Sequence, residues 1–326
     1  MHLAREFGFD ETAVGRVALV ATELSSNLVK HAQHGRMLLG VVQSDNGGWM
    51  VELLSLDKGP GISDLPACLA DGFSTGGTAG TGLGAVRRLS AEFDAFSQPI
   101  GGTLVLARVA ASGATRSPSV GTDTSGNPAV APACTIGALA LCAPGERVCG
   151  DAWDAVQRGR QVAVMVADGL GHGPYAAEAS SAATAIFGED PFVSPSQVLN
   201  RVHLGLKATR GAAVAVAQID LDQATLSFSG AGNIAGRILS GVEDRTLLSQ
   251  NGTAGMQIRS MQDVRHAWAA HATLVLHSDG VVSRWSLQDA PGLLLHHPVL
   301  LAAWLIRDHC RGRDDATAVV IRRRLN

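Results

Sequence analysis

The sequence predicts a two-domain protein of the α+β / α/β class. With 326 residues, of which 46% are hydrophobic and 17% charged, the chain can bury two cores. Residues 110–132 are low in large apolar side chains and dense in Ser, Thr, Gly and Pro, which is typical of a flexible linker. Helix patterns and strand patterns occur on both sides of it. We therefore expect a domain at 1–109 and a strand-rich domain at 133–326, tethered rather than fused.

Composition excludes several classes of protein. The net charge of -3 and the pI near 6.4 argue against a general nucleic-acid binder, and the basic cluster Arg322–Arg324 is expected to be a solvated chain end. Five cysteines without a C-x-x-C pair indicate reduced thiols rather than a disulfide framework or a zinc site. No apolar run reaches membrane length, and the first residues lack a signal-peptide core. We expect a cytoplasmic protein without nucleic-acid or membrane partners.

The first domain opens with a helix predicted from about Glu11 to Ala32, capped by Asp10. Glu23, Asn27 and His31 recur every four residues and therefore share one side of this helix. A carboxylate and an amide one turn apart can hold a hydrated divalent ion and polarise a hydroxyl or water. The alternative is an ordinary solvated polar edge.

Two strands are expected next, at 37–42 and 48–56, around a turn at Asp45–Gly48. The second strand ends in Asp57-Lys-Gly-Pro-Gly61. Asp57 could accept the exocyclic amine of a purine, and Gly59 and Gly61 permit close approach of the ring.

A flexible segment at 71–79 then leads to Gly80-Thr-Gly-Leu-Gly84, which opens a helix through Leu89. Glycines at a helix start leave N–H groups and a positive dipole end free to face phosphates. A lone Gly-x-Gly-x-Gly is weak evidence, and it does not follow the strand-then-turn order of a Rossmann fingerprint.

Taken in order, Glu23-Leu-Ser-Ser-Asn27, Asp57-Lys-Gly-Pro-Gly61 and Gly80-Thr-Gly-Leu-Gly84 resemble the N box and the two glycine boxes of the GHKL (Bergerat-fold) ATP-binding superfamily. Asp71-Gly-Phe-Ser-Thr-Gly-Gly and Gly101-Gly-Thr-Leu-Val look most like the RsbT type of serine kinase and its anti-sigma relatives. The resemblance covers residues 1 to about 109. Members usually carry more chain before the first helix, so we expect a domain shortened at its N-terminus.

This resemblance implies an α/β sandwich that binds ATP with Mg²⁺. It makes Asn27 the Mg²⁺ ligand, Glu23 the catalytic base and Asp57 the reader of adenine, with residues 71–84 as a lid over the phosphates. The cofactor-binding residues that it implies are Asn27, Asp57, Gly59, Gly61, Gly80, Thr81, Gly82, Leu83 and Gly84.

The second domain contains the most informative stretch. The apolar run 162–167 predicts a buried strand that delivers Asp168 into a turn with glycines at 169, 171 and 173. A helix is expected at once, because Pro174 suits a first helical position and residues 175–187 have helical spacing. Strand, acidic turn and helix form the layout of an ion site, although an ordinary capped turn has the same pattern.

Three more acidic turns flank predicted strands. Asp151 follows the strand 135–142 and a Pro-Gly turn, Asp279 follows the strand 272–277, and Asp314-Asp315 precedes the strand 318–322. The other elements expected here are a helix at 195–207, a hairpin of 209–219 with 223–229, and a strand at 234–240.

Oxygen ligands at separate positions suit a hard cation such as Mg²⁺ or Mn²⁺, and the lack of a His/Cys pattern argues against zinc or copper. Two such ions can activate a water that attacks phosphorus, without a nucleophilic Ser or Cys. The alternative is that these acids are merely turn formers.

Gly150-Asp151, Asp168-Gly-Leu-Gly-His-Gly173, Ser278-Asp279-Gly280 and Asp314-Asp315-Ala-Thr317 resemble the metal motifs of metal-dependent serine/threonine phosphatases. Over residues 134–326 they look like the SpoIIE-type branch, nearest to RsbX-like members. This implies an αββα sandwich, with Asp168 bridging two ions as the catalytic centre. Asp151 and the Gly169 carbonyl would serve the first ion and Asp279 with Asp314 the second. Asp315 is the alternative to Asp314. His172 either donates to the substrate phosphate or is a turn residue without a role.

Together, the two resemblances imply a bacterial partner-switching regulator. One half would phosphorylate, and the other dephosphorylate, a STAS-type anti-anti-sigma or stressosome protein. One alternative is a phosphatase whose N-terminal half only senses nucleotide. Another is an anti-sigma module that binds a sigma factor, with the phosphatase as its reset.

Overall fold

The computed structural model describes residues 1–45, 47–69, 82–111, 132–241 and 244–324. The chain forms two compact units. The first comprises Met1–Ala131 and Leu287–Ala303, and the second comprises Pro132–Ser286 and Trp304–Asn326.

The first unit contains an antiparallel sheet with the strand order β1-β2-β4-β3. Its strands are β1 (Arg36–Gln43), β2 (Trp49–Leu56), β3 (Glu92–Gln98) and β4 (Gly102–Ala110). Its helices are α1 (His2–Glu6), α2 (Glu11–His31), α3 (Leu65–Leu69) and α4 (Leu83–Leu89), and the segment 287–303 adds the short turns η2 (Leu287–Asp289) and η3 (Leu293–Leu295). The predicted hairpin of 37–42 with 48–56 is confirmed as the β1–β2 pair.

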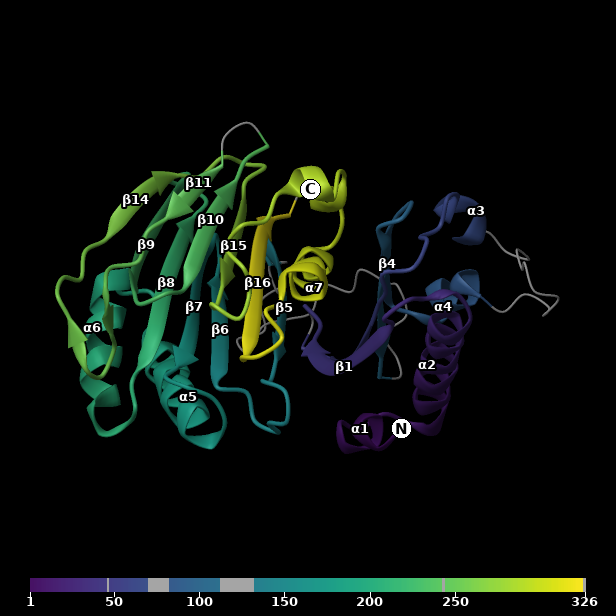
Figure 1. Ribbon diagram of the computed structural model, residues 1–326, viewed down its shortest axis with the longest axis horizontal. Coiled ribbons are helices and arrows are strands. Elements are labelled where there is room, and N and C mark those ends of the chain that lie inside the picture. Colours follow the sequence, from purple (N-terminus) through teal and green to yellow (C-terminus); the bar gives the residue numbers. More distant parts are fainter. Residues whose placement is uncertain (46, 70–81, 112–131, 242–243, 325–326) are drawn as a thin grey trace. The chain divides into compact units, whose positions relative to one another are not determined.

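The core of this unit lies between α2, α4 and one face of the sheet (Figure 1). Val17 and Leu24 on α2 pack with Leu53 and Val105 on neighbouring strands. The predicted cap of α2 is confirmed, because the Asp10 carboxylate accepts a hydrogen bond of 2.7 Å from the Ala13 N–H. The packing keeps α2 and α4 on one side of the sheet.

The second unit is a sandwich of two five-stranded antiparallel sheets, with the orders β11-β10-β15-β16-β5 and β14-β9-β8-β7-β6. The first sheet contains β5 (Cys134–Leu141), β10 (Ala235–Leu239), β11 (Arg245–Leu247), β15 (Thr273–His277) and β16 (Ala316–Arg323). The second contains β6 (Asp151–Arg158), β7 (Gln161–Gly169), β8 (Ala212–Asp220), β9 (Thr225–Ala231) and β14 (Val264–Ala267). The remaining elements of this unit are β12 (Gly252–Thr253), β13 (Gln257–Ile258), α5 (Pro174–Glu189), α6 (Pro195–Gly205) and η1 (Leu206–Ala208). The helix α7 (Pro298–His309) is divided between the units, and its residues from Trp304 onward belong to the second.

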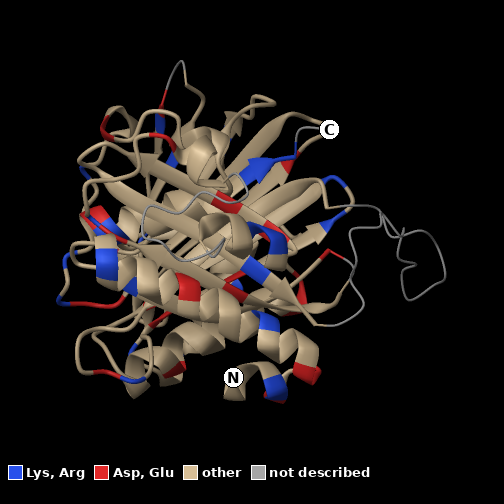
Figure 2. Ribbon diagram, turned by 90° about the vertical axis from the view of Figure 1, so that its right-hand side faces the viewer, with Lys and Arg blue, Asp and Glu red and all other residues tan. Residues whose placement is uncertain are grey.

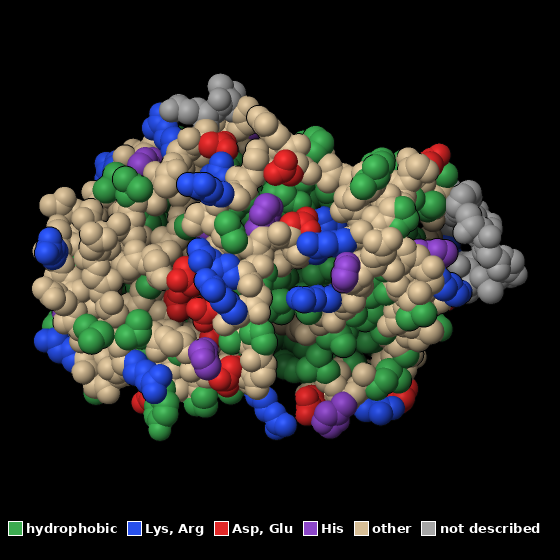
Figure 3. Space-filling view, in the orientation of Figure 1, with side chains coloured by type: hydrophobic (Ala, Val, Ile, Leu, Met, Phe, Trp, Pro, Cys, Tyr) green, Lys and Arg blue, Asp and Glu red, His purple; other side chains and the backbone are tan. Residues whose placement is uncertain are grey.

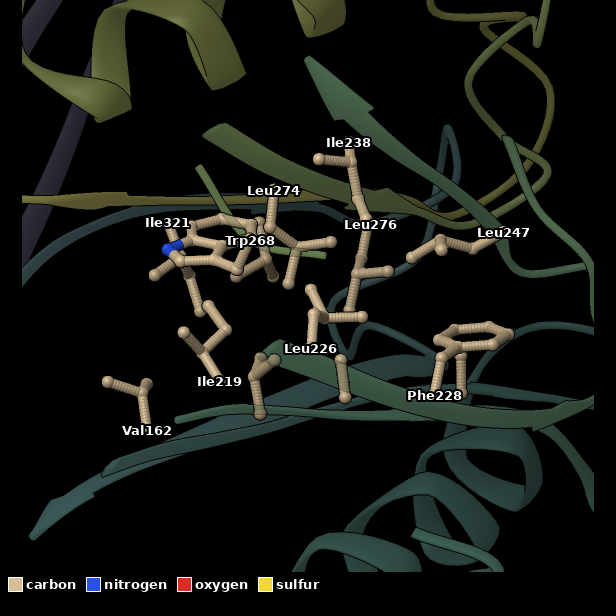
Figure 4. Packing of buried hydrophobic residues seen from close by; sticks show 14 of the residues in the cluster. Val162, Ile219, Leu226, Phe228, Ile238, Leu247, Trp268, Leu274, Leu276 and Ile321 are labelled. Carbon is tan, nitrogen blue, oxygen red and sulfur yellow. The ribbon is translucent and has the colours of Figure 1, made fainter. Parts of the chain in front are cut away.

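The unbroken apolar run of β7 follows from its position between two cores. Val162, Val164 and Val166 face the other sheet and join a cluster with Leu276 and Ile321 (Figure 4). The alternate residues, Ala163, Met165 and Ala167, pack against the apolar faces of α5 and α6. Because successive strand residues point to opposite faces, a strand buried on both sides is apolar throughout.

Residues of the second unit also cover the outer face of the β10–β15 sheet. The Trp285 and Trp304 rings meet edge to face with centroids 6.3 Å apart, and the Arg237 guanidinium lies 3.9 Å from the Trp285 ring centroid. Trp304 lies in the part of α7 that belongs to the second unit, so this part supplies helical residues on the face opposite α5 and α6. The αββα sandwich that the resemblance implied is therefore present.

One predicted turn is wrong. Asp151 does not lie in a loop but is the first residue of β6, a strand that the sequence did not predict. Trp153 is 37% exposed and its polar neighbour Asp154 is half-buried, so the segment lacks the apolar alternation by which strands are recognised. The position of Asp151 is consequently fixed by a strand ladder.

Acidic and basic side chains are interspersed along the chain (Figure 2), and they are also mixed on the face drawn in Figure 3. All five cysteines are free thiols. Among the helices that the structure describes, none has both the length and the apolar character needed to span a membrane.

Candidate functional site

Four strand ends bring the predicted acids together in the second unit. Asp151 starts β6 and is the register partner of Asp168 near the end of β7. Asp279 follows β15 and Asp314 precedes β16, and these two strands pair so that His277 lies opposite Ala318. The charges of Asp151, Asp279 and Asp314 all act on the Asp168 carboxyl. The structure thus gathers four acids that are far apart in sequence.

Asp151 is held by residues of the opposite sheet. It is 5% exposed, and its Oδ2 accepts a hydrogen bond of 2.6 Å from the Ser278 hydroxyl. The Ser278 oxygen in turn accepts a bond of 2.9 Å from the Thr317 N–H. The other carboxylate oxygen, Asp151 Oδ1, is buried and accepts no hydrogen bond from the described residues. This oxygen is therefore oriented and available to a cation.

The electrostatic environment of the four carboxylates favours a bound cation. Burial and repulsion from Asp151, Asp279 and Asp314 raise the pKa of Asp168 from 3.8 to about 8. Burial also raises the pKa of Asp151 to about 6, against the lowering effect of its bond from Ser278. A bound cation removes this repulsion. Because the donors are carboxylate oxygens, the set fits hard divalent ions such as Mg²⁺ or Mn²⁺.

Two glycines let backbone segments approach the cluster. A β-carbon at Gly169 would overlap the carbonyl oxygen of Ala176 in α5, and one at Gly280 would overlap the carbonyl oxygen of Asp315. The first contact seats α5 against the end of β7, and the second seats the Ser278–Gly280 turn against the start of β16. The predicted glycines thus permit the convergence of strand ends.

Asp314 and Asp315 have different surroundings. Asp314 is half-buried, and its Oδ1 accepts a bond of 3.0 Å from the Asp315 N–H. Asp315 is 3% exposed, and its Oδ1 accepts a bond of 2.8 Å from the Ala143 N–H in the loop after β5. Asp315 therefore ties β16 to that loop, while Asp314 lies nearer the surface.

Two polar contacts at this site were missed at the sequence level. The Asn233 side-chain amide donates a bond of 2.7 Å to Asp279 Oδ2. His172 Nδ1 lies 2.7 Å from Glu146 Oε1, so this turn histidine has a carboxylate partner on another loop. Both pairs join residues from separate loops, and no local pattern signals such contacts. Asn233 directly precedes the predicted strand 234–240, and this position is the only local signal for it.

In the first unit, α2 presents Glu23 and Asn27 as half-buried residues, while His31 is exposed. The Asp57 turn lies against the end of this helix. The Lys58 N–H donates a bond of 2.8 Å to the Gln33 carbonyl, and a β-carbon at Gly59 would lie 2.9 Å from the His31 carbonyl oxygen. The N box and the first glycine box are therefore neighbours in space.

The Asp57 carboxylate is oriented by its own turn, because Oδ1 accepts a bond of 2.7 Å from the Gly59 N–H. Gly61 has a φ of +75°, and a β-carbon there would overlap the carbonyl oxygen of Gln98. Gly82 directly precedes α4, and Leu83 and Gly84 are buried in its first turn. Gly80, Thr81 and most of the predicted lid at 71–84 lie outside the described residues.

Two family models match the chain. The model of stage II sporulation protein E (SpoIIE) matches residues 158–324, and that of the histidine kinase-like ATPase domain matches residues 1–108. The serine/threonine-protein kinase RsbT of Bacillus subtilis (strain 168) is 36% identical over 107 residues, which span 32% of this chain and 79% of that protein.

Solved structures of other proteins share the fold of this chain. A structure from the bacterial stressosome, described as a modular system adapted to control secondary messenger signalling, is 26% identical with a TM-score of 0.55 and covers 58% of this chain and 99% of its own. The PP2C phosphatase domain of SpoIIE from Bacillus subtilis, solved with a fragment of its regulatory domain, has a TM-score of 0.50 at 19% identity. That match covers 96% of this chain and 90% of the other.

Proposed function

Because this chain belongs to the SpoIIE family of serine/threonine phosphatases, matches the histidine kinase-like ATPase domain over residues 1–108 and is similar to the kinase RsbT, we propose that it is a bifunctional partner-switching regulator. In this proposal residues 1–109 form an ATP-dependent serine/threonine kinase and residues 133–326 a metal-dependent phosphatase. Residues 110–132 link them, and both act on one phosphoprotein.

The convergence of the carboxylates of Asp151, Asp168, Asp279 and Asp314 carries the phosphatase half of the proposal. In our assignment Asp168 would be shared by two divalent ions, Asp151 and the Gly169 carbonyl would hold the first, and Asp279 with Asp314 would hold the second. The bound ions would neutralise the substrate phosphate and supply an activated water. The unpartnered Asp151 Oδ1 and the raised pKa of Asp168 both support a cation at this position.

The residues around the acids would keep the site in order. Ser278 holds Asp151 Oδ2 and Asn233 holds Asp279 Oδ2, so the second oxygen of each carboxylate would be left to bind an ion. His172 is exposed beside this turn and is oriented by Glu146, so it can donate a hydrogen bond to a phosphate oxygen of the substrate. Residues 170–172 of this turn are exposed, so a phosphoserine or phosphothreonine of a protein can reach it.

The kinase half rests on the neighbouring N box and Asp57 turn. In our assignment Asp57 accepts the adenine amine, Asn27 holds the Mg²⁺ of ATP and Glu23 takes the proton of the substrate hydroxyl. The backbone of Gly59, Gly61 and Gly80–Gly84 would line the nucleotide. The 36% identity to the kinase RsbT across 79% of that protein supports transfer rather than binding alone.

We infer that the common substrate is a small STAS-type protein of the anti-anti-sigma or stressosome class. The kinase relative and the stressosome neighbour support this inference. Opposed activities in one chain need a switch, which we assign to the nucleotide state or to partner docking. The linker would keep both modules at high local concentration around the same substrate.

The decisive experiment compares the intact protein with Asp168→Ala and Glu23→Gln/Asp168→Ala variants. Each is incubated with ATP, Mg²⁺, Mn²⁺ and a candidate STAS protein, and phosphate on its serine or threonine is followed by mass spectrometry. Accumulation with Asp168→Ala alone would support both activities. If no variant adds phosphate while the intact chain clears a pre-phosphorylated STAS protein, the kinase half is a sensor. Capture of a sigma factor by the full chain would favour the anti-sigma alternative.

A further inference from the structure

Besides the oxygen-rich cluster, the second unit contains a group of metal-ligating side chains with a different chemistry. The sulfur atoms of Cys142 and Cys149 and a carboxylate oxygen of Asp315 all lie within 4.8 Å of one another. Among the described residues, no other group of three or more His, Cys, Asp or Glu ligand atoms lies within this distance, the oxygen-rich cluster included. We call the group of Cys142, Cys149 and Asp315 the thiol cluster.

The fold brings these residues together through a short loop between two strands. Cys142 follows β5 and Cys149 precedes β6, and the Glu146 N–H donates to the Ala143 carbonyl at 3.0 Å, which turns the loop back on itself. Asp315 anchors the loop by accepting the Ala143 N–H at 2.8 Å. Within the cluster, Cys142 is exposed, Cys149 is half-buried and Asp315 is buried.

One atom of the thiol cluster lacks a partner. Asp315 Oδ2 is buried and accepts no hydrogen bond from the described residues, although Asp315 is only 3% exposed. A buried carboxylate oxygen without a partner is unfavourable, and a nearby cation is the usual compensation. The two adjacent thiols decide which cation fits, because sulfur ligands select zinc over Mg²⁺ or Mn²⁺.

We propose that Cys142, Cys149 and Asp315 bind a Zn²⁺ ion, with a fourth position open to solvent beside Cys142. Zinc bonds of about 2.0–2.3 Å place the ligands of a tetrahedral ion less than about 4 Å apart, so the thiol cluster needs only a small contraction. The sequence argued against zinc because it has no C-x-x-C pair. The turn of the loop brings the two thiols together without that motif.

Such an ion would act on the phosphatase site through the loop that it clamps. Glu146 lies between the two cysteines and contacts His172, which belongs to the glycine-rich turn after Asp168. Asp315 is also adjacent in sequence to Asp314. Zinc occupancy would therefore fix the position of Glu146 and thus of His172. The zinc site itself does not depend on whether the chain is a kinase or a phosphatase.

Cobalt substitution in the full-length protein tests the site directly. The reduced, metal-free protein is saturated with Mg²⁺ to fill the oxygen cluster and is then titrated with Co²⁺. Binding through thiolates produces a sulfur-to-cobalt charge-transfer band, which binding through oxygen does not. We expect one equivalent of this band and its loss on addition of one equivalent of Zn²⁺.

Variants assign the ligands. Cys142→Ser and Cys149→Ser should each weaken cobalt binding by about 100-fold or more, since loss of a ligand exceeds the 10–100-fold effect of an outer contact. Asp315→Asn keeps the acceptor for Ala143 and should weaken binding with an unchanged circular dichroism spectrum. Cys310→Ser and Cys68→Ser are the matched controls and should bind like the intact protein.

The proposal would be overturned if the intact protein gave no charge-transfer band, or if the band survived both cysteine substitutions. It would also be overturned if mass spectrometry found a Cys142–Cys149 disulfide that persists under the reducing conditions of the titration. Phosphatase activity is not the readout. Failure of this site would therefore leave the proposed function untouched, and the reverse also holds.

Discussion

Asp151 and Asp168 are direct register partners in the antiparallel β6–β7 ladder. Opposite residues of such a pair have α-carbons about 4.5–5.5 Å apart and side chains on the same face of the sheet. The β6–β7 hairpin therefore forces two carboxylates together at its open end, and burial raises the pKa of both. The strand pairing thus holds two carboxylates that repel each other when both are charged, and a bound divalent cation would offset this repulsion.

This relationship predicts that the stability of the cation-free protein depends on pH. The pKa of Asp168 is about 8 in the folded protein and 3.8 ordinarily, so its stabilising contribution is complete below about pH 4. It is lost as pH rises through about 8. We expect the melting temperature in EDTA to fall between about pH 4 and about pH 8 and to level off above that, and Mn²⁺ to reverse most of that fall. Differential scanning fluorimetry across this range measures both effects.

Asp168→Asn provides the control for this prediction. It removes the charge but keeps the size of the side chain, so the variant should melt at a higher temperature than the intact protein at about pH 9 in EDTA. Its melting temperature should respond little to Mn²⁺. An unchanged pH profile in the variant would show that the pH dependence has another source.

Ser278 predicts a second effect, on the affinity for divalent ions. Ser278→Ala removes the bond to Asp151 Oδ2 and leaves the Thr317 N–H without its acceptor. We expect a loss of about 1–3 kcal/mol in stability. Because Asp151 is then free to rotate, the concentration of Mn²⁺ needed for half-maximal phosphatase activity should rise about 10–100-fold.

Ser180→Ala is a matched control, because the Ser180 hydroxyl is equally buried but donates to the Ala177 carbonyl within α5. It should alter the Mn²⁺ requirement little. Equal Mn²⁺ requirements in Ser278→Ala and the intact protein would argue against an orienting role for Ser278.

The backbone conformation of Gly61 leads to a third prediction, on the affinity of the first unit for ATP. The Gly61 φ of +75° disfavours any residue with a side chain, and a β-carbon would overlap the Gln98 carbonyl. Gly61→Ala should therefore displace the Asp57 turn and weaken binding of a fluorescent ATP analogue by about tenfold or more, which corresponds to about 1.4 kcal/mol. Gly40→Ala on β1 is the control, because its β-carbon would meet nothing within 4 Å. If Gly61→Ala and Gly40→Ala bound the ATP analogue with equal affinity, the assignment of Asp57 to the adenine site would be wrong.

Much of the fold could be predicted where the local pattern was strong. The apolar run 162–167 predicts that β7 is buried on both faces, and Asp10 predicts the start of α2. β6 and α7 escaped prediction for opposite reasons. β6 carries polar residues on its exposed face without clear alternation, whereas α7 is so apolar that it shows no amphipathic period.

In the candidate site, too, the features with a strong local pattern could be predicted and the others could not. The acids could be found because each one borders a strand and a turn, which are local features. The thiol cluster depends on the turn of one loop and on its contact with the distant Asp315, and the Asn233–Asp279 contact joins two loops that meet only in the folded chain. Sequence spacing carries no information about such meetings, so the ruling against zinc from the absence of C-x-x-C rested on a local rule.

A last prediction concerns the sheet that supports the nucleotide site. Arg108 on β4 is the register partner of both Glu52 on β2 and Glu92 on β3, and its guanidinium lies 2.7 Å from each carboxylate. Arg108 and Glu52 are nearly buried, with side chains 11% and 9% exposed. Arg108→Met keeps the bulk of the side chain but leaves the Glu52 charge without its partner, which should destabilise the first unit by about 3–5 kcal/mol.

Hydrogen exchange of the full chain locates this effect. Peptides from β2 and β4 should exchange faster in Arg108→Met, while peptides from β7 and β8 in the second unit serve as the internal control. Adding Glu52→Gln should restore part of the protection, because a neutral amide tolerates burial better than an unpaired carboxylate. If Arg108→Met left the protection of β2 and β4 unchanged, the ion pairs would contribute little to stability. The sheet would then depend on the packing of Leu53 and Val105 against α2.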